Sequence, residues 1–213
     1  MALTRIGGAN AISGTIPQGN IANASLGAVT ALPAAISTGS MVLLQTTTAS
    51  NVSSVTMGSS SLLDNTYKAY KIIGSNVVPA SDGVNGHARI SIGGSVKSDA
   101  YYRRCRIRMY DGSATVSGYA NTDMNTMGNY FGESIGSASG ENVNFESIVY
   151  DPSNTSSHTF FSVMTAGQDL SPNSQLQLIE FVYTNSTAAV DGVQFYFSSG
   201  NIESGTFKLY GLS

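Results

Sequence analysis

The stretch Leu176–Thr184, which reads LQLIEFVYT, decides the fold class of this 213-residue chain. Leu176, Leu178, Glu180 and Val182 fall on one face of an extended strand, and the residues between them fall on the other. Apolar side chains dominate both faces. We therefore expect a β-strand that is buried on both sides or that uses its outer side as an interface.

Eight more segments with the composition of strands flank this stretch, and turn signals containing Gly, Asp and Pro separate them. They are Met41–Ala49, Tyr67–Gly74, His87–Gly93, Tyr101–Tyr110, Val143–Tyr150, His158–Thr165, Val193–Ser198 and Thr206–Tyr210. Many short strands without a convincing helix predict an all-β domain. Antiparallel strands in this number close into two packed sheets, and the jelly roll is an arrangement that also protects its edges. We expect residues 41–213 to form an antiparallel, jelly-roll-like β sandwich.

The segment Asn121–Glu141 reads as a long polar loop, and loops of this length are often functional or pack across an interface. It contains Tyr130, one of eleven tyrosines. Tyrosine combines an apolar ring with a hydrogen-bonding hydroxyl, which suits both sugars and protein interfaces. Tyr101, Tyr102 and Tyr130 are therefore candidate surface contacts for a glycan or for a neighbouring subunit.

Three arginines, Arg104, Arg106 and Arg108, alternate onto one face of the expected strand Tyr101–Tyr110. We expect this face to be solvated or to form ion pairs between subunits, with binding of phosphate or an acidic glycan as the alternative. Cys105 falls on the opposite face, and we expect it to be a buried, unreactive thiol.

Residues 1–40 differ from the rest, because no charged side chain occurs between Arg5 and Asp64 and the apolar residues stand apart from one another. Their spacing fits neither a strand nor a helix. We expect an extended N-terminal anchoring arm that places single side chains into successive pockets of a partner. A flexible leader without a partner is the alternative. The expected arm contacts are Ile6, Ile12, Ile16, Ile21, Leu26 and Leu32.

The composition excludes several classes of function. Charged residues make up 11% of the chain and the net charge is −3, so the basic surface of a nucleic-acid-binding protein is absent. There is no run of about 20 apolar residues and no secretory signal, which predicts a soluble protein made in a cytoplasm without membrane insertion. One cysteine and two histidines are too few for a disulfide or most zinc sites, and no Gly-x-Ser-x-Gly motif occurs. We expect neither an enzyme nor a cofactor.

A resemblance to a known family rests on three segments: Leu3–Pro17 (LTRIGGANAISGTIP), Tyr67–Ile72 (YKAYKI) and Phe197–Gly211 (FSSGNIESGTFKLYG). They are similar to the leader, an early Tyr-rich strand and the closing strands of jelly-roll structural proteins of tailed bacteriophages. The resemblance implies a homotrimer on the virion surface, made in the host cytoplasm and held by other virion proteins of the tail or capsid through its arm. It carries over no catalytic residues.

The expected function is therefore a structural one, as a trimeric short tail fibre or surface appendage, with attachment to a host-surface glycan as an additional role. Two alternatives stay open. One is a capsid decoration or cement protein, and the other is a carbohydrate-binding module that uses exposed tyrosines.

Overall fold

The computed structural model describes residues 41–111 and 115–213. These residues belong to the second of two units in the chain, Thr38–Ser213. The expected arm contacts Ile6, Ile12, Ile16, Ile21, Leu26 and Leu32 lie outside the described residues.

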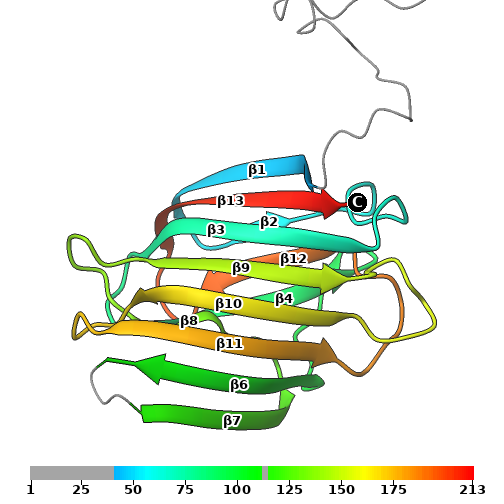
Figure 1. Cartoon of the computed structure of the whole chain (residues 1–213). Helices are drawn as coiled ribbons and strands as arrows, with labels where there is room; N and C mark the ends of the chain where they lie inside the picture. The colour runs from blue at the N-terminus through cyan, green and yellow to red at the C-terminus, as the bar shows by residue number, and fades with distance from the viewer. Residues whose placement is uncertain (1–40, 112–114) are drawn as a thin grey trace, which may run out of the picture. The chain divides into compact units, whose positions relative to one another are not determined.

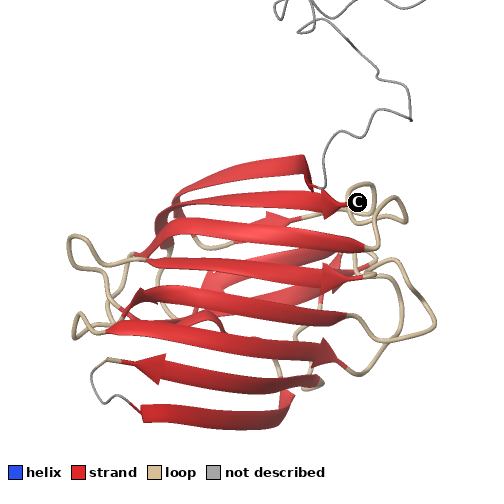
Figure 2. Ribbon diagram, viewed as in Figure 1, coloured by secondary structure: helices blue, strands red, loops and turns tan. Residues whose placement is uncertain are grey.

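One layer of the body is an eight-stranded antiparallel sheet, here called sheet A, with the strand order β1-β13-β3-β9-β10-β11-β6-β7 (Figure 1). In this order its strands are β1 (Met41–Val52), β13 (Ile202–Leu212), β3 (Ala69–Pro79), β9 (Val143–Tyr150), β10 (Phe160–Gln168), β11 (Ser174–Tyr183), β6 (Tyr102–Tyr110) and β7 (Thr115–Met124). Strands joined by loops make up the whole described body in Figure 2, and no helix is drawn there.

The second layer, sheet B, lies behind sheet A in Figure 1 and has five strands. They are β2 (Val55–Met57), β12 (Gly192–Phe197), β4 (Val84–Ile92), β5 (Ser95–Val96) and β8 (Met127–Ile135). Both β5 and β8 pair with β4, and β8 also contacts β9, β10, β11 and β6 of sheet A. Strand β8 therefore joins the two layers.

The strand pairs are nested in the way that defines a jelly roll. Strand β1 pairs with β13, β2 with β12, β3 with β9, and β4 with β8, all antiparallel. The chain thus resembles one long hairpin folded over into two sheets, with β1-β13-β3-β9 in one and β2-β12-β4-β8 in the other. The predicted all-β, jelly-roll-like sandwich is confirmed.

Two insertions enlarge sheet A beyond this jelly roll. Strands β5, β6 and β7 lie between β4 and β8 in the chain, and β10 and β11 lie between β9 and β12. Of these, β10, β11, β6 and β7 continue sheet A past β9 as a four-strand extension. The extension is visible as the lower half of the front sheet in Figure 1.

An aromatic core fills the space between the layers. The rings of Phe131 and Phe145 lie 5.3 Å apart, those of Phe145 and Phe195 5.4 Å, and those of Phe195 and Phe207 5.5 Å. Tyr130 stacks on Phe181 of the extension at 5.4 Å. Aromatic pairs at such distances add to the free energy of burying their large apolar surfaces.

The prediction of a loop at Asn121–Glu141 is wrong, because this segment contains the end of β7 and all of β8. Strand β8 is irregular, with shifts in its register to β4 and positive φ angles at Asn129, Gly132 and Ser134. These irregularities interrupt the alternation of apolar and polar residues that identifies a strand in a sequence.

Candidate interaction surface

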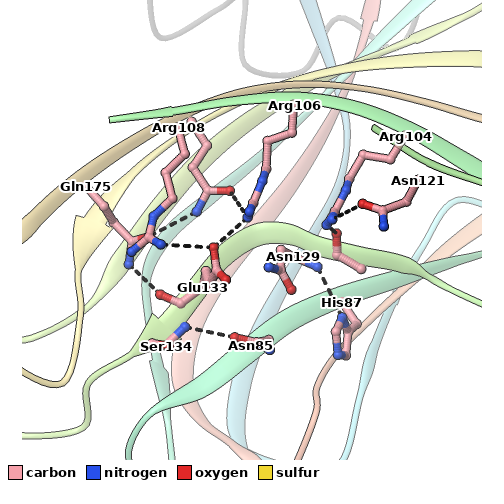
Figure 3. A network of polar contacts seen from close by, with 12 residues as sticks. Asn85, His87, Arg104, Arg106, Arg108, Asn121, Asn129, Glu133, Ser134 and Gln175 are labelled. Atoms are coloured by element: carbon pink, nitrogen blue, oxygen red, sulfur yellow. Dashed lines mark hydrogen bonds and ion pairs between the residues drawn. The ribbon is translucent and has the colours of Figure 1, made fainter. Parts of the chain in front are cut away.

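Strand β6 faces the opposite way from the sequence-based expectation. Arg104 and Arg106 are 9% and 4% exposed, and they point inward toward β8 together with Arg108 (Figure 3). The alternate side chains point outward, and Ile107 and Met109 are 50% and 47% exposed. The charged half of the strand is therefore inside the body and the apolar half is outside.

The inward arginines are held by a polar network centred on Glu133 of β8. Arg106 Nη1 donates hydrogen bonds to Glu133 Oε2 at 2.7 Å and to Gln177 Oε1 at 3.2 Å. Arg108 Nη1 lies 3.2 Å from the same carboxylate oxygen. Arg104 donates to the Gly128 carbonyl oxygen and to Oδ1 of Asn121. One carboxylate thus compensates neighbouring guanidinium groups.

The network contains more positive than negative charges. Within the described residues, the Nε atoms of Arg104, Arg106 and Arg108 are buried without a hydrogen-bond partner. Burial, followed by repulsion from Arg106, lowers the pKa of the Arg104 guanidinium, and Glu133 opposes this shift. The Tyr119 ring partly offsets the missing carboxylates, because the Arg106 guanidinium lies 4.2 Å from its centroid.

The same network fixes β8 against β4 of sheet B. The Ser134 amide donates to Asn85 Oδ1 at 2.8 Å, and the Asn129 amide donates to His87 Nδ1 at 3.2 Å (Figure 3). Burial, together with the charges of nearby arginines, lowers the pKa of His87 to about 4. A neutral imidazole is consistent with its role as an acceptor at Nδ1.

The outward side of the extension and of β9, here called the outer face, carries many exposed apolar side chains. Ile107 lies opposite Leu178, and Leu178 lies opposite Met164. Directly opposed residues of antiparallel strands share one face and touch their neighbours. The large apolar members of the outer face are Ile107, Met109, Val116, Tyr150, Phe160, Met164, Leu176 and Leu178, each at least 39% exposed.

A shallow groove of about 550 Å³ runs across the outer face over β11, β6 and β7. Its lining residues include Cys105, Ile107, Leu178 and the small residues Gly118 and Ala120. The small side chains of β7 leave room beside the larger ones of β6 and β11, so the surface is grooved and apolar.

The outer face also carries charges of both signs. Glu146 of β9 forms an ion pair with Lys71 of β3 at 2.5 Å. Arg103 and Glu180 lie on neighbouring strands, opposite Val182 and Cys105 respectively. No hydrogen bond or ion pair joins either side chain to another of the described residues, and partial burial raises the pKa of Glu180.

The predicted surface tyrosines divide into one exposed and two buried side chains. Tyr101 is 44% exposed, as expected for a surface contact. Tyr102 and Tyr130 are fully buried and use their hydroxyls internally. The Tyr102 hydroxyl donates to the Lys97 carbonyl oxygen at 2.8 Å, and the Tyr130 hydroxyl shares a hydrogen bond with Ser147. The prediction of surface contacts is wrong for these two tyrosines, because the inward faces of β6 and β8 hold them.

The prediction is also wrong for Arg104 and Arg106 as surface contacts, because the carboxylate of Glu133 holds their strand face inside the body. The expectation of a buried Cys105 is also wrong, because its side chain lies on the outward, exposed face of β6. For Leu176–Thr184 we expected a strand that is buried on both sides or that uses its outer side as an interface. The structure exposes that outer side at Leu176 and Leu178, so burial on both sides is wrong within the described residues.

Two further findings concern metal binding and membrane spanning in the described residues. Among them no three His, Cys, Asp or Glu side chains gather in a way that could hold a metal ion. No helix in residues 41–111 and 115–213 is long and apolar enough to cross a membrane. A scan against protein-family models found no match, and searches of curated proteins and of solved structures found no similar protein.

Proposed function

We propose that the protein is a non-enzymatic structural component of a tailed-bacteriophage virion. In this proposal it is a trimeric short tail fibre or surface appendage that is made in the host cytoplasm. Residues 1–40 anchor it to other virion proteins, and its body contacts the host surface as an additional role. The observation that carries the proposal is the outer face, an apolar surface on a jelly-roll body. A protein that works as a lone monomer rarely exposes such a surface, whereas a subunit of an assembly needs one.

Two further features support this proposal, one from the composition and one from the resemblance. The chain is poor in charge, at 11%, which reduces repulsion between closely packed copies. The third segment of the phage-like resemblance, Phe197–Gly211, spans the end of β12 and most of β13. These strands lie at the centre of the jelly roll, where they pair with β2, β4, β1 and β3.

The location is tested by placing a small tag after residue 2 and imaging purified particles. Label at the tail is expected for a fibre or appendage, whereas label over the capsid lattice would indicate a decoration or cement protein. Particles that carry no label, although the tagged protein is made and folded, would contradict a role in the virion.

The anchoring role of residues 1–40 is tested by replacing Ile6, Ile12, Ile16 and Ile21 with Ser. We expect the body to keep its melting temperature while incorporation into particles falls sharply, because the apolar contacts of an extended segment supply its specificity. The matched control replaces Ala9, Ala11, Ala24 and Ala28 with Ser. Equal incorporation of both variants would contradict the anchoring role.

A further inference from the structure

We propose that the outer face of β9 and the four-strand extension binds a second copy of this chain. The inference rests on the proposed function only in that both require assembly, and it specifies the surface that the copies share. The apolar residues Ile107, Leu178 and Met164 form the centre of the contact, and Arg103 and Glu180 provide its charges.

The size of the outer face fits a contact between subunits. Its eight large apolar side chains are 39% to 59% exposed. The six on β10, β11, β6 and β7 that adjoin one another, Ile107, Met109, Val116, Met164, Leu176 and Leu178, together present on the order of 500 Å² of surface. Patches above a few hundred Å² are unusual on monomers, and a stable interface covers roughly 800 Å² on each partner.

No layer of the described body covers this face. Sheet B packs on the opposite side of sheet A, where the arginines and the aromatic core lie. Strand β6 cannot turn over to bury Ile107 and Met109, because the turn would expose Tyr102 and remove Arg106 from Glu133. The apolar side chains of β6 therefore stay exposed on the outer face, where a partner can cover them.

The charges favour a second copy as that partner. Arg103 and Glu180 have opposite signs, lie on neighbouring strands, and are unpaired within the described residues. Copies whose outer faces meet around the three-fold axis of the proposed trimer offer Arg103 of one copy to Glu180 of the next. The outer face presents both signs, so it matches a copy of itself better than a uniformly charged partner.

Residues 1–40 of the same chain fit this surface less well. They contain one charged side chain, Arg5, so they offer no carboxylate to Arg103. A buried or half-buried charge without a partner is unfavourable. A second copy supplies a partner for Arg103 and one for Glu180.

The test uses the full-length protein and two matched leucines. Leu178 lies in the outer face and is 49% exposed, and Leu170 lies in the loop after β10 and is 50% exposed. We expect Leu178→Lys to lower the mass measured by light scattering from an oligomer to a monomer, and Leu170→Lys to leave it unchanged. Circular dichroism checks that each variant is folded. Val116→Lys on the edge strand β7 is a second variant, for which we also expect a monomer.

Cys105 provides an independent readout, because it is the single cysteine and lies in the groove of the outer face. We expect its thiol to react with a maleimide at least about tenfold more slowly in the wild-type oligomer than in the Leu178→Lys monomer, since reaction then requires dissociation. The Leu170→Lys variant should react at the wild-type rate.

Three results would overturn the inference. The first is a wild-type monomer with a freely reactive Cys105, and the second is a wild-type monomer with a protected Cys105, which would show that its own chain covers the face. The third is an oligomer that keeps its mass in the Leu178→Lys and Val116→Lys variants. None of these results depends on incorporation into particles, so a failed interface and a failed virion role are distinguishable.

Discussion

At the scale of single residues, the orientation of β6 is decided by the partners of its arginines. A buried guanidinium is tolerated only when charges and hydrogen bonds compensate for lost water. Glu133, Gln177 and the Gly128 carbonyl supply that compensation on the inner side. The inner side is therefore the better place for the arginines, even though this leaves Ile107 exposed.

We predict that Glu133→Gln destabilises the body, because it removes the carboxylate that Arg106 and Arg108 share. Breaking a buried ion pair costs several kcal/mol, and the partial exposure of Glu133 reduces the expected loss in free energy of unfolding to about 2 kcal/mol. Urea denaturation at one fixed protein concentration measures it. The control is Glu203→Gln, an exposed carboxylate, for which a change within about 0.5 kcal/mol is expected. Equal urea midpoints for both variants would contradict a central role of Glu133.

At the scale of elements, the sequence predicted strands well where alternation is regular. All nine expected segments overlap observed strands, and Val143–Tyr150 coincides with β9. The missed strands have physical reasons: β2 and β5 have three and two residues, and β7 is a polar edge strand. Strand β8 is bulged.

The facing of a strand was harder to predict than its presence. In β6 the alternation was recognised, but which half points inward depends on Glu133, which lies 27 positions beyond Arg106 in the chain. A sequence pattern gives two faces and does not say which one a second sheet will cover. For this reason the candidate contacts Tyr102, Arg104 and Arg106 were assigned to the surface. Tyr130 was assigned there because Asn121–Glu141 was expected to be a loop.

We predict that Gly74→Ala in β3 destabilises the sandwich, because a Cβ at this position would overlap the Phe145 ring on the neighbouring strand. Phe145 is part of the aromatic core and cannot move without disturbing Phe131 and Phe195. Overpacking of this kind costs about 2 kcal/mol. The control is Gly128→Ala in β8, where the nearest atom to the added Cβ is 3.8 Å away. Thermal unfolding of both variants checks the prediction, and equal melting temperatures would contradict it.

At the scale of the whole molecule, the distribution of apolar surface matters more than its amount. Of the fifteen large hydrophobic side chains exposed in the described residues, ten lie on the outward side of sheet A, including Met41 and Leu43 at its far edge. The low charge content of the sequence predicted subunit contacts without locating them. The insertions widen sheet A beyond the area that the strands of the jelly roll occupy, and the contact that we propose lies on this added area.

The pairing of Arg103 with Glu180 between copies leads to a charge-exchange prediction. Arg103→Glu alone places a carboxylate against Glu180 of the neighbouring copy, and Glu180→Arg alone places a guanidinium against Arg103. Each variant should therefore weaken association about tenfold through like-charge repulsion. The double variant restores one charge of each sign and should recover most of the wild-type dissociation constant, measured by sedimentation at several protein concentrations. The control exchanges a distant pair, Lys68 and Asp151, which form an ion pair at 3.3 Å within one chain. Association that is weaker in the double variant than in either single variant would show that Arg103 and Glu180 do not face each other, because compensation requires direct proximity.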